Sequence, residues 1–270
     1  MVKRFFRLCL LIFFAAGIPF CSLHAQDSLI RTIPVANVSF ITLDPNGNLY
    51  VVSRQNTLLR FDKDGMLTGQ YNNIQNGQLQ WVDASNPLKI LLFYPQFSKI
   101  ILLDNMMSPK TSINLQQSGF FNISVCGLSE DNNIWLYDYQ KAKLFKLSNQ
   151  MEILSESNDL RAETGTRPYP TGILASGNTV YLSDTSQGIY TFDRFGNYLN
   201  TLSIKSVGQL QKVNQQLIWY ANGQLHNYNL QNFRQKNLSL SAGARNALVS
   251  RDRLYILQAD KIAIFYSDND

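Results

Sequence analysis

Residues 176–184 read SGNTVYLSD and residues 188–196 read GIYTFDRFG. The same pattern occurs earlier in the chain, as LDPNGNLYVV at 43–52 and LLRFDKDG at 58–65. In both copies, short runs of alternating β-branched and aromatic residues are separated by Gly, Asn and Asp, which tolerate the positive φ of tight hairpin turns. Each copy therefore predicts a strand, a tight turn, a second strand, a loop and a third strand.

Four weaker copies of this unit occupy much of the remaining chain, at 86–104, 132–147, 215–229 and 251–266. Successive copies are 42, 44, 45, 36 and 37 residues apart when measured between six positions taken as equivalent: Phe61, Leu103, Leu147, Phe192, Tyr228 and Phe265. This period is typical of β-propeller blades of four antiparallel strands. Paired helices are disfavoured because the turn residues recur at intervals too short for them.

The two ends of the repeat region predict how the ring closes. Only four residues follow Phe265-Tyr266, so the sixth copy lacks its outermost strand and would expose unpaired backbone groups. Residues 29–33 (LIRTI) form a short alternating strand before the first blade begins at about Val38. We therefore expect an all-β fold: a six-bladed β-propeller of four-stranded antiparallel blades, in which this N-terminal strand completes the last blade.

The first 26 residues have the layout of a secretory signal peptide. Basic residues at 3, 4 and 7 precede an apolar run at 8–18, and a short polar stretch ends in LHAQ at 23–26. The apolar run is about half the roughly twenty residues that a membrane-spanning helix needs. We predict a signal peptide at 1–26, a single propeller domain at 27–270 without a transmembrane segment, and export to the periplasm or the cell surface.

Charge argues against a nucleic-acid partner. Three of the 24 Lys and Arg residues lie in 1–26 and none of the 19 acidic residues does, so cleavage lowers the formal net charge from +5 to +2. No cluster of basic residues remains to contact a phosphate backbone.

The cysteines exclude an internal disulfide bond in the exported chain. Cys9 and Cys21 belong to the predicted signal peptide, which leaves Cys126 alone. Cys21 follows the bulky residues 18–20 (IPF), which do not suit a lipidation site. Cys126 stands within the apolar stretch 123–128, where a small buried side chain is expected.

The fourth copy resembles an NHL repeat. The landmarks occur in that repeat's order: PTGI at 170–173, VYLSD at 180–184 and IYTFD at 189–193, followed by Gly196. The first copy matches from Asp44 to Gly65, and the others match only in outline. The chain thus resembles the broad NHL, TolB-like and SMP-30-like group of six-bladed propellers. This resemblance implies a fold and no single function, because members include enzymes, receptors and scaffolds.

Lactonases of the SMP-30 type hold a divalent cation with oxygen ligands from the innermost strands. Here the innermost strands are expected near six segments without any Asp or Glu: 38–42, 78–82, 122–127, 171–175, 208–213 and 246–249. Asp44, Asp83 and Glu130 are expected at or beyond strand ends, where acids form turns. We therefore predict no metal site.

Other catalytic sets are also not expected. The NHL-type amidating lyases bind zinc with several histidines, whereas residues 27–270 contain only His226. A catalytic triad would need the same histidine, and no nucleophile elbow or phosphate-binding loop is present. Asp62, Asp104 and Asp193 recur at one position of the repeat, which favours a role in turns. The sequence therefore predicts no catalytic residue and no cofactor.

Recognition is then expected on loops and strand ends. The longest irregular segment, 158–170, carries Arg161, Arg167 and Tyr169. Together with Asn122, Arg245 and Asn246 it is expected to ring one mouth of the central channel and bind a ligand, although a solvated connector is the competing interpretation. Trp81, Trp135 and Trp219 are expected in the core between blades, with a platform for carbohydrate binding as the competing interpretation.

The leading functional hypothesis is an exported, non-catalytic propeller that binds a protein partner and acts as a scaffold in the cell envelope. The first alternative is a metal-dependent hydrolase or lactonase of the SMP-30-like type. The second is a sensor domain that binds a glycan or a peptide. The identity of the partner is not encoded in any motif.

Overall fold

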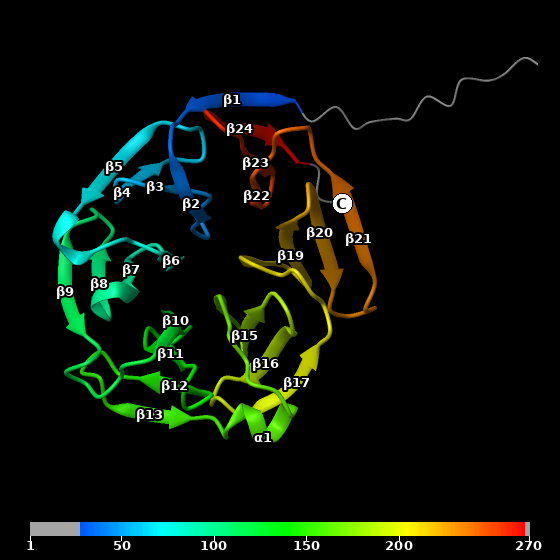
Figure 1. The fold of residues 1–270 in the computed structure, drawn as a ribbon. Coiled ribbons are helices and arrows are strands. Elements are labelled where there is room, and N and C mark those ends of the chain that lie inside the picture. The colour runs from blue at the N-terminus through cyan, green and yellow to red at the C-terminus, as the bar shows by residue number, and fades with distance from the viewer. Residues whose placement is uncertain (1–27, 268–270) are drawn as a thin grey trace, which may run out of the picture.

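The computed structural model describes residues 28–267, which form six four-stranded antiparallel sheets arranged in a ring (Figure 1). Blade 1 contains β2 (Val38–Leu43), β3 (Leu49–Ser53), β4 (Thr57–Phe61) and β5 (Leu67–Asn72). Blade 2 contains β6 (Trp81–Asn86), β7 (Lys89–Tyr94), β8 (Lys99–Asp104) and β9 (Pro109–Asn114). Blade 3 contains β10 (Ile123–Leu128), β11 (Ile134–Asp138), β12 (Lys143–Leu147) and β13 (Ile153–Glu156).

The other three blades follow the same order from the axis outward. Blade 4 contains β14 (Gly172–Ser176), β15 (Thr179–Asp184), β16 (Gly188–Asp193) and β17 (Tyr198–Leu202). Blade 5 contains β18 (Leu210–Val213), β19 (Gln216–Ala221), β20 (Gln224–Asn229) and β21 (Gln235–Ser239). Blade 6 contains β22 (Asn246–Val249), β23 (Arg253–Leu257), β24 (Lys261–Tyr266) and, from the other end of the chain, β1 (Leu29–Pro34).

The six positions used to measure the period occupy equivalent places in the third strands. Each pairs with a residue at or near the start of the second strand: Phe61 with Leu49, Leu103 with Ile90, Leu147 with Ile134, Phe192 with Val180, Tyr228 with Leu217 and Phe265 with Leu254. The predicted repeat and fold class are therefore confirmed.

The ring is closed by the N-terminal strand, as predicted. Strand β1 pairs antiparallel with β24, with Ile33 opposite Ile262 (Figure 1). The Ile33 side chain is buried, and Arg31 Nη1 donates a hydrogen bond to the carbonyl oxygen of Asp64 in blade 1 at 2.9 Å. Because β1 covers β24, blade 6 has the same four strands as the others.

Strand direction gives the ring two distinct faces. The innermost strands begin at the face seen in Figure 1, which we call the front face; it carries the inter-blade connections, the two 3₁₀ turns η1 (Ile74–Asn76) and η2 (Pro95–Phe97), and the helix α1 (Leu160–Thr164). The opposite end, the back face, carries the turns between first and second strands and between third and fourth strands. No helix among residues 28–267 is long and apolar enough to span a membrane.

Apolar side chains pack between neighbouring blades rather than around the axis. Tyr50 and Leu58 of blade 1, for example, belong to the same buried cluster as Leu92 and Tyr94 of blade 2. Trp135 and Trp219 are buried between blades as predicted. Both faces of each sheet are covered by neighbouring blades. The side chains along the axis are therefore polar or half-buried.

Recurrent acids hold the turns of the back face. One carboxylate oxygen of Asp62 accepts hydrogen bonds from the backbone N–H groups of Asp64 and Met66. Asp104 and Asp193 do the same in their own turns. The structural role predicted for these three aspartates is thus borne out. The predicted signal peptide, residues 1–26, lies outside the described residues.

Candidate functional site

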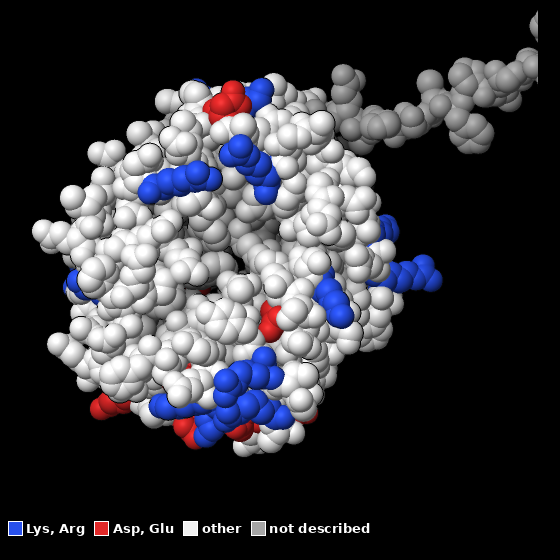
Figure 2. All heavy atoms as spheres, viewed as in Figure 1, with Lys and Arg blue, Asp and Glu red and all other residues white. Residues whose placement is uncertain are grey.

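The axis of the ring contains two cavities, one toward each face, and Figure 2 shows the hollow at the centre of the front face. The back cavity has a volume of about 430 Å³ and the front cavity about 240 Å³. Both are lined by Trp81 and Gln209, which lie where the two cavities meet.

Gln209 crosses the channel and joins three blades. It stands immediately before the innermost strand of blade 5, and its Nε2 donates to the carbonyl oxygen of Ile41 in blade 1 at 2.8 Å. Its Oε1 accepts from Asn246 Nδ2 in blade 6 at 3.2 Å. The amide is thus held in one orientation by hydrogen bonds on both of its polar atoms.

Two more side chains, Gln211 on an innermost strand and Ser183 on the second strand of blade 4, are bonded to a neighbouring blade. Gln211 pairs with the backbone of Val249, donating to its carbonyl oxygen at 3.2 Å and accepting from its N–H at 2.9 Å. The Oγ of Ser183 donates to the carbonyl oxygen of Gly208 at 2.6 Å. These polar groups hold the ring together, because each satisfies a backbone group of the next blade.

Asp83 lies inside an innermost strand, and the prediction that it sits at a strand end is wrong. Strand β6 begins at Trp81, three residues later than the expected strand at 78–82, and its pairing with β7 is irregular beyond Asp83. Asp83 Oδ2 accepts from the backbone N–H of Leu128 in blade 3 at 2.7 Å, and Oδ1 accepts from Ser85 at 2.8 Å. Desolvation raises the pKa of this carboxyl, although these hydrogen bonds oppose the shift.

The other two acids of this region differ from each other. Asp44 forms a turn, as predicted, and accepts from the backbone N–H groups of Asn46 and Asn48. Glu130 Oε1 instead accepts from the backbone N–H of Gly177 in blade 4 at 2.7 Å. Glu130 therefore bridges two blades instead of closing its own turn.

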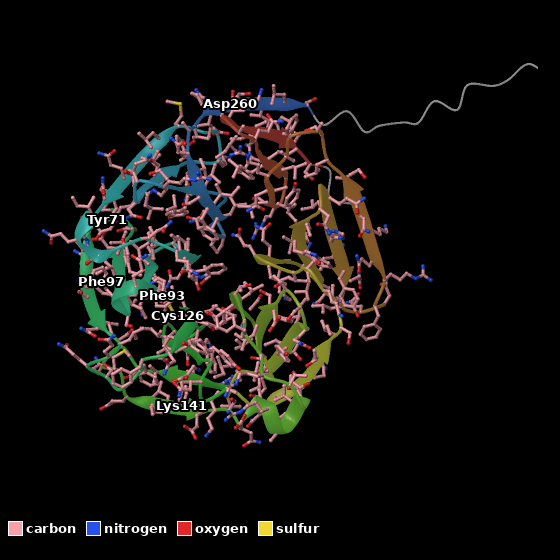
Figure 3. All side chains as sticks on the ribbon, viewed as in Figure 1. Tyr71, Phe93, Phe97, Cys126, Lys141 and Asp260 are labelled. Atoms are coloured by element: carbon pink, nitrogen blue, oxygen red, sulfur yellow. The ribbon has the colours of Figure 1, made fainter. Side chains whose placement is uncertain are left out.

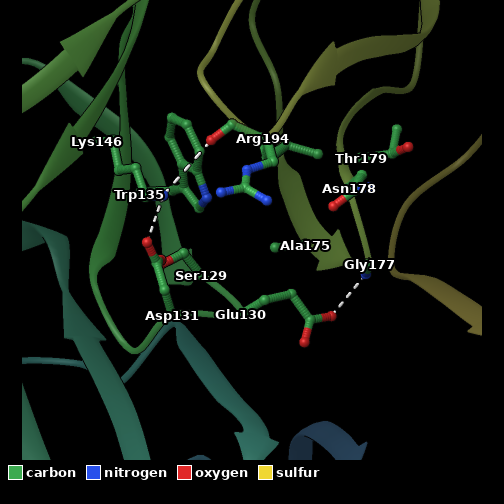
Figure 4. A pocket seen from close by; sticks show the side chains of 11 residues that line it. Ser129, Glu130, Asp131, Trp135, Lys146, Ala175, Gly177, Asn178, Thr179 and Arg194 are labelled. Carbon is green, nitrogen blue, oxygen red and sulfur yellow. Dashed lines mark hydrogen bonds and ion pairs between the residues drawn. The ribbon is translucent and has the colours of Figure 1, made fainter.

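A groove of about 200 Å³ leaves the back cavity between blades 3 and 4 (Figure 4). The two spaces share Glu130 and Ala175 as lining residues, so they form one continuous surface, which we call the back groove. In Figure 4, Glu130 and Arg194 extend into it from opposite walls. The guanidinium of Arg194 lies 5.0 Å from the ring centroid of Phe195 and forms no ion pair with any residue in 28–267.

An ion pair forms the inner wall of the back groove. Lys146 Nζ lies 2.8 Å from Asp131 Oδ2 and 5.4 Å from the ring centroid of Trp135. Partial burial raises the pKa of Asp131, but the hydrogen bonds from Lys146 and Ser129 outweigh it and lower the pKa to about 2. Asp131 is therefore ionised at neutral pH and fixes the lysine against the indole.

The predicted binding residues all lie at the front face, but only Asn246 lines the channel. Asn122 Nδ2 donates to Gln140 and its Oδ1 accepts from Tyr139, so its amide is engaged locally. Arg245 is exposed, and its backbone N–H donates to the carbonyl oxygen of Leu257.

The segment 158–170 is more ordered than expected. Asp159 caps the helix α1 and forms an ion pair with Arg161, so the guanidinium of Arg161 already has a partner within its own segment. Tyr169 is exposed and its ring centroid lies 5.3 Å from that of Tyr139, while Arg167 is exposed without an ion pair in the described part of the chain. Figure 2 shows Lys and Arg side chains gathered over this helix, away from the channel, and Figure 3 places Lys141 in the same region.

Trp81 is the main residue of the channel that the sequence pattern assigned to the core between blades. It packs against the buried cluster between blades 2 and 3, in line with the prediction, but it is half-buried and also lines both cavities. The difference follows from its strand: Trp135 and Trp219 lie in second strands, whereas Trp81 opens a first strand. Trp81 follows immediately after a connection between two blades, and this position was the sign in the sequence that it begins an innermost strand.

Residues capable of nucleophilic or metal chemistry are separated in space. Within residues 28–267, no three His, Cys, Asp or Glu side chains are placed to hold one metal ion. His226 lies on β20 and stacks on Trp219, with ring centroids 5.0 Å apart. Cys126 is buried as predicted, close to the axis in Figure 3, and desolvation followed by the charge of Asp83 raises its pKa well above the usual value.

Comparisons with known proteins support the fold. No protein-family model and no curated protein sequence matches the chain. Among solved structures, a streptogramin B lyase superimposes with a TM-score of 0.59 at 14% identity, covering 86% of this chain and 80% of that chain.

Two further solved structures give similar values. A catalytically inactive histidine-to-alanine variant of virginiamycin B lyase from Staphylococcus aureus with quinupristin has a TM-score of 0.59 at 14% identity, covering 86% and 81% of the two chains. The Swd1 β-propeller domain of Myceliophteria thermophila has a TM-score of 0.61 at 12% identity, covering 88% and 99%. The fold-level resemblance to propellers is thus confirmed, and at these identities it is limited to the fold.

Proposed function

We propose that this protein is an exported, non-catalytic β-propeller that binds a protein partner at its back face and acts as a scaffold in the cell envelope. The observation that carries this proposal is that polar side chains of the channel form hydrogen bonds within the ring. Asp83, Gln209 and Gln211 each bond to the backbone of another blade. Groups used in this way are poor candidates for a nucleophile or a general base.

Exposed apolar side chains on the back face support a protein partner. Leu88, Met106, Phe195 and Phe233 stand in turns of blades 2, 4 and 5, with exposures of 70%, 73%, 58% and 70%. Single exposed apolar residues are ordinary on protein surfaces. Here they accompany the larger cavity at the same end of the ring, and apolar groups around a polar groove are typical of protein-binding surfaces.

The charges of the back groove indicate what kind of segment it accepts. Arg194 and the half-buried Lys212 lack an ion-pair partner among residues 28–267, whereas Glu130 is bonded to a backbone N–H. Asp44 and Asp83, which line the same space, likewise accept hydrogen bonds from backbone N–H groups, whereas Arg194 and Lys212 are basic and have neither an ion pair nor a side-chain hydrogen bond within residues 28–267. We propose that an extended segment of the partner lies in the groove and places a carboxylate near Arg194 and Lys212.

The comparison with the lyases does not favour catalysis here. One of those structures is a variant inactivated by replacement of a histidine. The only histidine within residues 27–270 of this chain, His226, lies in the third strand of blade 5, with hydrogen bonds to Asn237 and the carbonyl oxygen of Ala221. It is not among the residues that line either axial cavity.

The test is capture of the partner in the native host. The tagged full-length protein is cross-linked in intact cells and purified, and partners are compared between wild type, Arg194→Glu and a Phe195→Asp/Phe233→Asp double variant. We expect one dominant partner in the envelope fraction that both variants lose. Arg167→Glu provides the matched control, because Arg167 is an exposed arginine at the front face, away from the groove.

Metal analysis and fractionation separate the alternatives. Stoichiometric calcium or zinc in the purified protein, bound at the channel, would replace the scaffold proposal with the metal-dependent hydrolase. Recovery of the protein with an uncleaved N-terminus in the cytosol would contradict export.

A further inference from the structure

The front cavity differs chemically from the back groove. It has a volume of about 240 Å³, and every described residue that lines it is uncharged. An anionic or cationic ligand would have to leave water without meeting an opposite charge, which is strongly unfavourable. The lining therefore selects for an uncharged ligand.

One wall of the cavity is aromatic. Phe40 of blade 1 and Trp81 of blade 2 have ring centroids 5.1 Å apart with an angle of 44° between their planes. Both residues are half-buried and both line the cavity, with Phe93 beside them. This wall offers an apolar surface on which a flat ring can pack.

The remaining lining supplies hydrogen-bonding groups. Gln80 and Thr171 are exposed at the mouth, and the amides of Gln209 and Asn246 are fixed by their mutual hydrogen bond. Trp81 Nε1 and Ser124 Oγ are buried and have no hydrogen-bond partner within residues 28–267. Buried donors without a protein partner are rare and call for an explanation at each site where they occur.

We propose that the front cavity binds a single uncharged sugar ring. A pyranose has an apolar face that suits the Phe40 and Trp81 wall, and its hydroxyl groups match the amide and hydroxyl side chains around it. The cavity is smaller than the roughly 300–1,000 Å³ of sites that enclose drug-sized ligands, so it accommodates one ring and not an oligosaccharide. This site is independent of the protein partner proposed for the back face.

Trp81 provides the readout for the test. The full-length protein is titrated with glucose and with N-acetylglucosamine while tryptophan fluorescence and ligand-observed NMR are recorded. We expect saturation by at least one of the two sugars with a millimolar dissociation constant, the order expected for a ligand of about a dozen non-hydrogen atoms. A hexose 6-phosphate is expected to bind more weakly than the uncharged sugars.

Variants of the lining assign the binding to this cavity. Trp81→Leu is expected to abolish saturation, and Ser124→Ala and Gln80→Ala are each expected to weaken it by about 2- to 10-fold. Ser203→Ala, an exposed serine in the connection between blades 4 and 5, serves as the matched control and is expected to bind like wild type. Gln80→Ala preserves the test should Trp81→Leu fail to fold, because Gln80 is exposed.

Three results would overturn the proposal. The first is absence of saturation by either sugar. The second is sugar binding that Trp81→Leu and Gln80→Ala leave unchanged, which would place it elsewhere. The third is tighter binding of the hexose phosphate than of the uncharged sugars, which would assign the cavity to a different ligand class.

Discussion

Asp83 places a half-buried carboxylate on the wall of the back cavity, and its hydrogen bond to Leu128 N–H links blades 2 and 3. Gly127 lies against it: a Cβ at that position would stand 2.8 Å from Asp83 Oδ2. The absence of a side chain at Gly127 therefore allows the carboxylate to reach the neighbouring strand. Burial is the main cause of the raised pKa of this group.

The raised pKa predicts the direction in which the free energy of unfolding changes with pH. The folded protein binds the Asp83 proton more tightly than the unfolded chain does, so the free energy of unfolding falls as pH rises through the raised pKa. Asp83→Asn removes this dependence. We expect the variant to gain stability relative to wild type as the pH is raised from 4 to 8, measured by urea unfolding at each pH.

The matched variant for this test is Asp83→Ala. It leaves the Leu128 N–H without an acceptor, so we expect it to be about 1–3 kcal/mol less stable than Asp83→Asn across the same pH range. If the difference between Asp83→Asn and wild type does not change with pH, the carboxyl titrates alike in the folded and unfolded protein, and the assigned role of burial is wrong.

Gly188 is constrained by both its conformation and its surroundings. Its φ is +130°, and a Cβ would stand 2.3 Å from the backbone oxygen of Leu202. Because that atom belongs to a strand, it cannot move aside cheaply. We expect Gly188→Ala to lower the free energy of unfolding by about 3 kcal/mol or more, measured by urea unfolding.

Gly243→Ala isolates the backbone-conformation part of this effect. Gly243 also has a positive φ, of +94°, but a Cβ added there would meet no atom within 4 Å. Only the backbone preference is disturbed, for which about 1–2 kcal/mol is expected. Equal losses in the two variants would show that contact with Leu202 contributes nothing.

At the scale of the strand, β1 decides whether the ring is closed. Ile33 is its buried residue and packs in the cluster that also contains Ile41 of blade 1 and Ile262 of blade 6. Ile33→Ala is expected to cost about 2–5 kcal/mol. It is also expected to promote aggregation, because a loosened β1 exposes β24 as an edge strand. Urea unfolding and light scattering measure the two effects.

Thr32→Ala is the control for Ile33→Ala. It tests whether any substitution in β1, and not only the loss of the buried Ile33 side chain, lowers stability. Thr32 lies next to Ile33 in the same strand and is exposed. We expect its effect to stay within about 0.5 kcal/mol, with no change in scattering. A comparable loss in Thr32→Ala would mean that strand propensity, and not the packing of Ile33, holds β1 in place.

The strands could be predicted from the sequence where the local alternation of residues coincides with the period of the repeat. Phe61 and Phe192 occupy equivalent places because alternation and turn residues recur with them, and the missing outer strand of blade 6 indicated the role of β1. The start of β6 was not predictable in this way. The strand begins later than expected and continues past Asp83 to Asn86, and no local pattern reveals that the carboxylate accepts a hydrogen bond from Leu128 of another blade.

The channel was predicted less well than the sheets, for a physical reason. Gln209 bonds to Ile41, 168 positions away in the chain, across the axis of the ring. Such a contact depends on how six blades are arranged in space and leaves no periodic trace. The length of segment 158–170 predicted a binding loop, and the structure adds that this segment contains a helix and an Asp159–Arg161 ion pair; its role in binding stays a prediction.

For the whole molecule, closure determines how the blades unfold. Blades of an open array contact only their neighbours and can unfold piecemeal, as in solenoid repeats. Here β1 joins the last blade to the chain's beginning, and Gln209 connects blades 5, 6 and 1. A blade that unfolds in the closed ring therefore loses contacts on both sides, which favours a single cooperative transition.

Trp135 in blade 3 and Trp219 in blade 5 allow this cooperativity to be measured, because both are buried. Two single-tryptophan variants, each retaining one of them, are unfolded in urea and followed by fluorescence and by circular dichroism. With the ring closed, we expect each fluorescence midpoint to coincide with the circular dichroism midpoint of the same variant. Weakening β1 with Ile33→Ala in the same backgrounds is expected to separate the two probes, with Trp219, one blade from the loosened junction, responding at lower urea than Trp135. If the probes stay coincident while stability falls, the blades are coupled through their inter-blade cores alone, and the β1 clasp adds stability without adding cooperativity.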